Sequence, residues 1–126
     1  MSEANVVDSS GWLEYLADTE RAPIFAPAIE DSGNLIVPVI SLYEVFKKVL
    51  RERGEDDALR VAGIMQSGRV VELDIALALE AARHPLPLAD SIIYATAMQH
   101  DATPWTQDEH FKDLPNVRYF PKQVSV

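Results

Sequence analysis

Four acidic residues stand where the sequence predicts that a strand ends or a helix begins. Asp8 ends a β-branched run, Glu44 lies near the start of a helix, Asp90 begins an apolar helix, and Asp108 follows a short strand. Ionised carboxylates that meet raise one another's pKa values unless a divalent cation lies between them. Because all-oxygen ligation suits hard ions, these acids predict a site for Mg²⁺, with Mn²⁺ as a second candidate.

A site of this kind has the components for phosphodiester hydrolysis. The reaction needs an activated water and neutralisation of the charge that develops on phosphate and leaving oxygen, and carboxylate-held metal ions supply both. We expect Asp8, Asp90 and Asp108 to be direct or water-mediated metal ligands. Glu44 is expected to be a ligand or a base that positions water. No side chain is needed as a nucleophile.

Each acid also has a purely structural interpretation. Ser41 and Glu44 have the spacing of a capping box, in which both side chains satisfy backbone N–H groups at a helix start. Asp8 and Asp90 could stabilise helix N-termini. For any one acid a cap is the commoner role. Four unrelated caps, however, have no reason to lie at one edge of a sheet.

The hydrophobic pattern predicts an α/β fold. Five short strands alternate with helical segments, which is typical of a three-layer α/β/α sandwich with a central, mostly parallel five-stranded sheet. The strands are expected near residues 6–7, 35–37, 69–72, 103–106 and 117–120. A first helix is expected to be capped by Ser9 or Ser10 and to contain Trp12, Leu13 and Leu16, and further helices are expected near residues 20–30, 41–53, 55–66, 75–83 and 88–99. Right-handed crossovers bring successive strand ends to one edge, so the four acids should converge there.

Several local signals accompany these elements. Pro27 is expected to kink or shorten the second helix, whereas Pro23 suits its first turn. Gly33 is a candidate for the left-handed residue after that helix. Gly54 should end the third helix, and Asp74 should cap the fifth.

The composition is that of one soluble domain spanning residues 1–126. Of the 126 residues 48% are hydrophobic, none is cysteine, and the apolar runs are too short to span a membrane. A cytoplasmic protein is expected. The formal charge of −9 opposes a nucleic-acid partner at long range, although metal ions and a local basic strip could neutralise the contact surface. The same charge favours a basic protein partner.

Four sequence motifs resemble those of the PIN-domain nucleases, in particular the VapC toxins of bacterial toxin–antitoxin pairs. They lie at residues 6–10, 38–45, 88–97 and 106–111. The resemblance implies a magnesium-dependent endoribonuclease in which Asp8, Glu44, Asp90 and Asp108 form the acidic cluster and Thr106 supports it. It also implies an RNA substrate, a cognate VapB-type antitoxin and a homodimer. We assign Ser9 a supporting role as well.

The helix that carries Glu44 also carries the densest basic group of the chain. Lys47, Lys48 and Arg51 are candidates for holding RNA phosphates, and Lys48 and Arg51 fall on the Glu44 side of the helix. An ion pair between Glu44 and Lys48 on a solvated face explains the pattern equally well. His110 could bind metal or move protons, but a solvated turn histidine is the preferred interpretation.

Other side chains allow further interpretations. Tyr15, Tyr43 and Tyr94 could serve an interface, although part-buried packing explains them too. Two other functions fit the same class of fold. A catalytically silent PIN-like interaction domain would keep all four acids. A receiver-type phospho-acceptor domain would need paired acids after the first strand, where Asp8 stands alone.

Overall fold

A computed structural model describes residues 3–122 and places all five predicted strands in one sheet. The sheet order is β3-β2-β1-β4-β5, and each of the four neighbouring pairs is parallel. The predicted mostly parallel sheet is thus confirmed. The strands are β1 (Asn5–Val7), β2 (Leu35–Pro38), β3 (Arg69–Val71), β4 (Thr103–Thr106) and β5 (Arg118–Tyr119).

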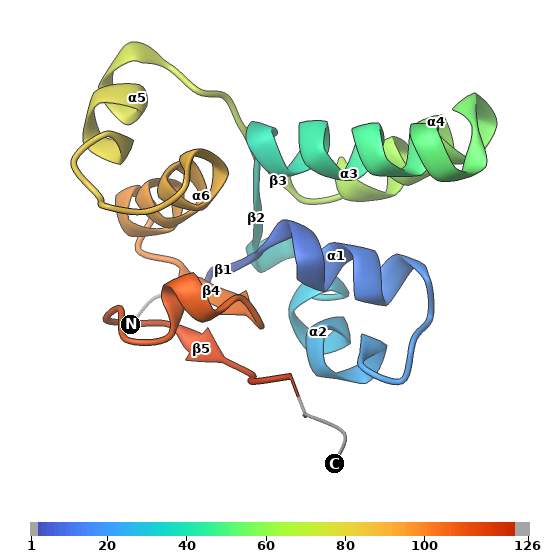
Figure 1. Cartoon of the computed structure of the whole chain (residues 1–126), viewed down its shortest axis with the longest axis horizontal. Helices are drawn as coiled ribbons and strands as arrows, with labels where there is room; N and C mark the ends of the chain where they lie inside the picture. Colours follow the sequence, from blue (N-terminus) through green and yellow to red (C-terminus); the bar gives the residue numbers. More distant parts are fainter. Residues whose placement is uncertain (1–2, 123–126) are drawn as a thin grey trace.

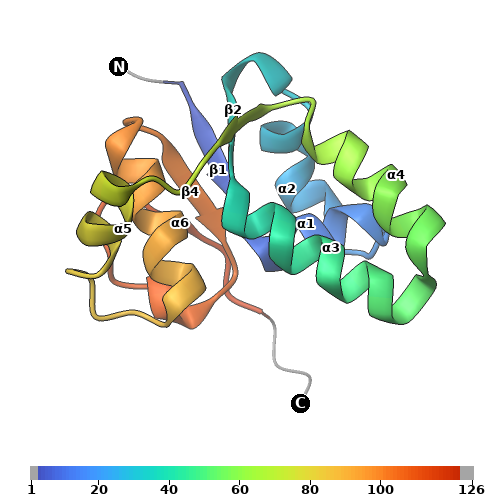
Figure 2. The ribbon, with the colours of Figure 1, turned by 90° about the horizontal axis from the view of Figure 1, so that it is seen from above.

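Six α-helices cover the two faces of this sheet (Figures 1 and 2). One face carries α1 (Ser9–Leu16), α2 (Ala22–Ile29), α3 (Val39–Arg53) and α4 (Glu55–Met65). The other face carries α5 (Ile75–Ala81) and α6 (Leu88–Gln99). Two short 3-10 helices, η1 (Ser32–Asn34) and η2 (Glu109–Phe111), complete the described fold. The predicted three-layer sandwich is confirmed.

The two central strands feed two separate cores. Val7 and Val37 pack in the core that also holds Trp12, whereas Val6 and Ile36 pack in the opposite core against α6. This division follows from the strand geometry, in which successive side chains point to opposite faces. It explains why β1 and β2 are apolar at every one of these positions, as expected for strands covered on both sides.

Helix α6 is buried through its middle turns. Every residue from 91 to 97 is buried, as its nearly uniform apolar sequence predicted. Tyr94 is therefore a core residue, only 4% exposed. Of its two interpretations, packing is correct and the interface role is not. Its hydroxyl donates a hydrogen bond to the carbonyl of Pro115. The N-terminal end of α6 carries Asp90.

Helix α3 begins earlier than predicted. It starts at Val39, directly after β2, and Pro38 is its N-cap residue without a side-chain hydrogen bond. Ser41 is instead fully buried inside the first turns, so the predicted capping box with Glu44 is wrong. The strand continues straight into the helix, and this connection leaves no place for a polar cap. Gly54, at φ 94°, ends α3 as predicted.

Helix α2 differs from the prediction in two details. Pro27 lies within the helix, which continues to Ile29, so Pro27 does not end it. The Pro27 ring is exposed, so it displaces no core side chain. Because proline has no N–H, the helix loses one backbone hydrogen bond, the one to the carbonyl of Pro23 in the first turn. Gly33 lies in η1 rather than in a left-handed position, since the helix closes on Glu30 in right-handed conformation.

Gly11 allows α1 to lie very close to the sheet. A Cβ atom at this position would be 2.8 Å from Val7 Cγ1 and from Phe25 Cδ1. This close approach brings Asp8 and Ser9, which open α1, to the carboxyl end of β1. None of the helices within residues 3–122 has the length and apolar character needed to cross a membrane.

Candidate metal centre at the carboxyl edge of the sheet

The site lies where the strand order reverses. The chain passes from β1 to β2 and β3 on one side and later adds β4 and β5 on the other, so β1 and β4 are neighbours across this switch point. Ligands of open α/β sheets bind in the crevice beyond the strand ends at such a point. Asp8 directly follows β1, and Thr106 is the last residue of β4.

Thr106 connects two of the predicted acids. Its hydroxyl donates a 2.6 Å hydrogen bond to Asp8 Oδ2 and accepts one of 2.9 Å from the backbone N–H of Asp108. Thr106 is fully buried, so both bonds are shielded from solvent. The supporting contact expected for this residue is present in the structure.

Asp8 combines the two roles that the sequence left open. Its Oδ1 accepts a 2.8 Å hydrogen bond from the Gly11 N–H, which makes Asp8 the N-cap of α1. Ser10 adds a hydroxyl donor at 3.2 Å. Burial nevertheless raises the pKa of Asp8 above its ordinary value, and the charge of Asp108 adds to the rise. A cap alone does not require burial beside another acid.

Glu44 reaches the site from the second turn of α3. Ser9 donates a hydrogen bond of 2.5 Å to Glu44 Oε1, which ties the start of α1 to α3. The alternative interpretation of Lys48, an ion pair with Glu44, is not found among the described residues, since Lys48 Nζ instead lies 3.7 Å from Glu52 Oε1.

The tightest group of ligand-type atoms comprises Asp90, Asp108 and His110, whose ligand atoms all lie within 4.8 Å of one another. His110 Nδ1 is 2.8 Å from Asp108 Oδ1 and 3.1 Å from Asp90 Oδ2. Burial raises the pKa of Asp90 to about 7, and the Asp108 charge adds to this rise while His110 opposes it. These carboxylates are close enough to repel each other strongly.

His110 lies in an exposed turn, as the preferred interpretation expected, but its imidazole also contacts both acids, which sequence reasoning considered only as the less favoured alternative. Asp108 caps η2 by accepting a 2.9 Å bond from the His110 backbone N–H, which turns the imidazole back toward the acids. The signal was a capping aspartate two residues before a histidine in a short turn. The approach of Asp90 from another helix carries no such local signal.

All four predicted acids line one cavity of about 290 Å³. The structure thus brings Asp8, Glu44, Asp90 and Asp108 together at the carboxyl edge, whereas their catalytic roles stay predictions. The lining is completed by Ser9, Ser10, Leu13, Lys48 and Ile93. Of the three basic candidates on α3, Lys48 alone is among these lining residues. Lys47 instead contacts the hydroxyl of Tyr43 at 3.3 Å.

A polar network outside the cavity holds the turn that carries Asp108. The side-chain amide of Gln107 donates to Glu14 Oε2 at 2.9 Å and accepts from Arg21 Nε at 2.6 Å. Arg21 also donates to the carbonyl of Phe120. Gln107 lies between Thr106 and Asp108, so this network fixes the backbone between the two. Sequence reasoning did not identify it, because its members lie far apart in the chain.

The donor set fits a hard divalent cation. Asp90 and Asp108 offer carboxylate oxygens to one shared space, and the raised pKa of Asp90 is what two such groups show without a cation. Asp8 and Glu44 add negative charge from the same cavity. The predicted ligand set of Asp8, Asp90 and Asp108 overlaps this tight group in two members, and His110 is the third.

Several solved structures with the same fold are toxins or toxin–antitoxin complexes. A toxin–antitoxin complex from Klebsiella pneumoniae aligns with a TM-score of 0.78 and 18% identity, covering 96% of this chain and 100% of that chain. VapC20 of Mycobacterium tuberculosis, a sarcin-ricin loop cleaving toxin, aligns at 0.75 and 18% identity, with 94% and 100% coverage. VapBC2 from Rickettsia felis, bound to promoter DNA, aligns at 0.71 and 12% identity, with 94% and 98% coverage.

These likenesses concern the fold, because the identities are low. No curated protein matches the sequence. The family model of the PIN domain, in contrast, matches residues 6–117, which include all four acids, Thr106 and His110. Together with the sheet order and the acidic edge, this match shows that the chain belongs to the PIN domain family.

Proposed function

We propose that this chain is a metal-dependent endoribonuclease toxin of the VapC type. The observation that carries the proposal is the convergence of Asp8, Glu44, Asp90 and Asp108 on one cavity at the carboxyl edge of the sheet. Membership of the PIN domain family supports it, as does the fold shared with VapC20, which is described as a toxin that cleaves the sarcin-ricin loop. Family membership also rules out the receiver-type alternative.

Each residue of the cavity would have a separate role in hydrolysis. Asp90 and Asp108 would hold the divalent ion, Mg²⁺ or Mn²⁺, and Asp8 would bind it directly or through water. The bound ion supplies an activated water and charge neutralisation at the phosphate. Glu44, which accepts a hydrogen bond from Ser9, would orient the attacking water and accept its proton. Lys48, in the same cavity, offers a cation to an RNA phosphate.

Metal-dependent cleavage of RNA tests this function. The purified chain is incubated with a structured RNA in EDTA, in Mg²⁺ and in Mn²⁺, and the products are resolved on a sequencing gel. We expect discrete internal cuts with either ion and none in EDTA. The alternative, a catalytically silent interaction domain, predicts intact RNA under all three conditions.

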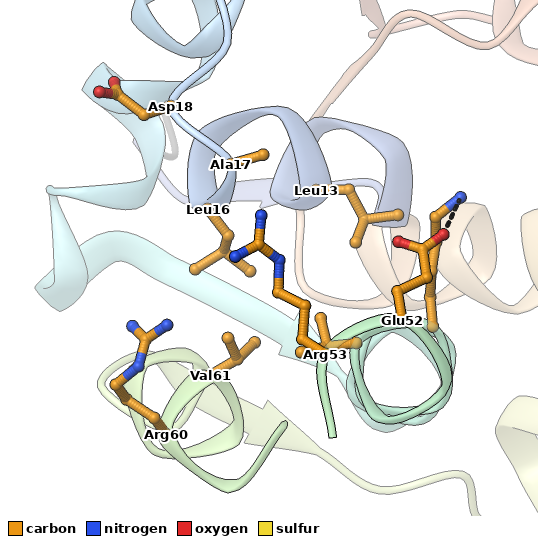
Figure 3. A pocket seen from close by; sticks show the side chains of 10 residues that line it. Leu13, Leu16, Ala17, Asp18, Glu52, Arg53, Arg60 and Val61 are labelled. Atoms are coloured by element: carbon orange, nitrogen blue, oxygen red, sulfur yellow. Dashed lines mark ion pairs between the residues drawn. The ribbon is translucent and has the colours of Figure 1, made fainter. Parts of the chain in front are cut away.

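A groove beside the acids fits an inhibitory partner. It has a volume of about 300 Å³ and lies between α1 and the α3–α4 pair, with Leu13, Leu16 and Val61 as apolar lining and charged side chains at its rim (Figure 3). Leu13 and Lys48 line both this groove and the acidic cavity, so the two are continuous. We infer that a VapB-type antitoxin lays an apolar segment here and inserts an Arg or Lys among the four acids.

The inserted cation would occupy the place of the metal ion and make charge-assisted bonds to the carboxylates. Co-expression with the small protein encoded beside this chain tests the inference. Replacement of the partner's basic residue should weaken inhibition, and added Mg²⁺ should compete at the contact. Equal inhibition without any basic residue would mean that the partner only covers the RNA path.

A homodimer is the second proposed assembly. Ile75 and Leu79, one turn apart on α5, and Leu88 at the start of α6 are 80%, 64% and 78% exposed, so their apolar surface faces water in the single chain. Burial of these residues against a second copy would remove them from water. The complexes of Klebsiella pneumoniae and Rickettsia felis show that proteins of this fold enter assemblies.

A further inference from the structure

We propose that His110 supplies a nitrogen ligand to the divalent ion of this centre and that the site therefore prefers Mn²⁺ to Mg²⁺. The inference rests on the proposed function, because it concerns the ion held by the same acids. It adds a ligand that the four-carboxylate cluster does not contain.

The separations of the three ligand atoms carry the proposal. His110 Nδ1 is 2.8 Å from Asp108 Oδ1 and 3.1 Å from Asp90 Oδ2. Adjacent ligands of an octahedral ion with bonds of roughly 2.1 Å lie about 3 Å apart. The nitrogen thus has the spacing to each oxygen that two ligands of one ion have.

The fold holds the imidazole in this position. Asp108 accepts the His110 backbone N–H at 2.9 Å, and the next residue, Phe111, is completely buried in the core under α6. The turn is therefore anchored on both sides of His110. The side chain itself is 56% exposed, whereas that of Asp90 is 15% exposed, so the ring forms the solvent side of the group.

The chemistry of the donor set decides between the two ions. Mg²⁺ binds oxygen almost alone and gives up its waters reluctantly, whereas imidazole nitrogen suits ions further along the first transition row. Between these two ions, a set of two carboxylates with one imidazole therefore favours Mn²⁺ over Mg²⁺. A set made of carboxylates alone gives no such preference.

A hydrogen bond from His110 to the two acids would show similar distances, but it has the opposite consequence. A ring that only donates to the carboxylates competes with any cation, so its removal would raise the affinity for both ions. A ring that binds the ion makes Mn²⁺ affinity fall on removal and leaves Mg²⁺ affinity nearly unchanged. The direction of the change thus separates the two roles.

Calorimetric titration of the full chain with Mn²⁺ and with Mg²⁺, without RNA, measures this direction. His110→Gln is compared with wild type and with His100→Gln, a matched control at the far end of α6, where the ring contacts the Thr96 carbonyl at 3.0 Å. We expect His110→Gln to lose about tenfold in Mn²⁺ affinity and less than about twofold in Mg²⁺ affinity. His100→Gln should match wild type for both ions.

Pulsed EPR of the Mn²⁺-loaded wild type detects a nitrogen ligand directly. It should show coupling to one imidazole nitrogen that changes when the histidines carry ¹⁵N and that persists in His100→Gln. Mn²⁺ bound without nitrogen coupling, or a rise in affinity for both ions in His110→Gln, would overturn the role of His110 alone. Failure of the wild type to bind either ion would overturn the metal-dependent nuclease as well.

Discussion

Thr106 Oγ1 donates a 2.6 Å hydrogen bond to Asp8 Oδ2, and this bond crosses from the end of β4 to the end of β1. The two residues are separated by 98 positions in the chain. The same hydroxyl accepts the N–H of Asp108. One buried side chain thus sets the relative position of two carboxylates in the proposed metal centre.

Replacement of this hydroxyl should affect both stability and activity. Thr106→Val leaves the Asp108 N–H and Asp8 Oδ2 without their partner, so we expect a loss of about 2 kcal/mol in the free energy of unfolding. RNA cleavage should fall by at least about tenfold, because the carboxylates lose their alignment. Thr106→Ser keeps the hydroxyl and is the control. Urea titration and initial cleavage rates measure the two effects, and equal behaviour of both variants would contradict this role.

The raised pKa of Asp90 predicts that the metal-free protein becomes less stable to unfolding as the pH rises. The folded state binds the carboxyl proton of Asp90 more tightly than the unfolded chain does. The free energy of unfolding that this proton contributes is therefore fully present below about pH 4 and is lost as the pH rises through about 7. Asp90→Asn should therefore be more stable than wild type by about 2 kcal/mol at pH 8 and nearly equal to it at pH 4.

Urea unfolding in EDTA across this pH range measures the difference. Addition of Mg²⁺ should stabilise the wild type at pH 8 and remove the advantage of the variant. An Asp90→Asn variant that is less stable than wild type at both pH values would show that Asp90 is a structural residue of the α6 N-terminus instead.

Lys48 is the basic residue whose removal should weaken RNA binding most. Lys48 lines the acidic cavity, where the proposed mechanism would place the scissile phosphate. Lys48→Ala should raise the KM for RNA by about threefold to tenfold and reduce the slope of log affinity against log salt by about one. Lys47→Ala, one residue away but outside the cavity lining, is the matched control. Equal effects of both substitutions would indicate a diffuse electrostatic contribution.

The exposed apolar side chains of α5 predict the behaviour of the chain in solution. Leu79→Glu should convert a homodimer into a monomer, because it places a charge in a surface that the dimer buries. Leu59→Glu, on α4 and 55% exposed, changes the charge equally and should leave the dimer intact. Light scattering after size-exclusion chromatography gives the mass. A monomeric wild type, or a dimer that withstands Leu79→Glu, would exclude this face.

Local sequence signals predicted those element boundaries that depend on a side chain bonding to backbone within a few residues. Asp74 caps α5 by accepting the N–H of Leu77, as expected. The burial of β1 and β2 on both faces of the sheet followed from their continuous apolar runs. The start of α3 was missed because a buried strand continues directly into it, so packing rather than a polar cap at Ser41 fixes the boundary.

The site could be predicted in part for a related reason. A parallel sheet brings strand ends to one edge, and this general property was enough to bring Asp8, Glu44, Asp90 and Asp108 together. The approach of His110 to Asp90 depends on how η2 packs against α6, and the exchange of Glu44 for Glu52 as the partner of Lys48 depends on rotamers. Contacts of this type have no signature in one sequence.

The metal-dependent nuclease centre is tested most directly by the rate at which Asp90→Asn cleaves RNA in Mg²⁺. Asp56→Asn, at an exposed site on α4, is the control. Asp90→Asn should lose at least about a hundredfold in cleavage rate while remaining folded. The double variant with Asp108→Asn should be little slower, because Asp90 and Asp108 act as a unit. Asp56→Asn should cleave like wild type. Full cleavage by folded Asp90→Asn would contradict the account.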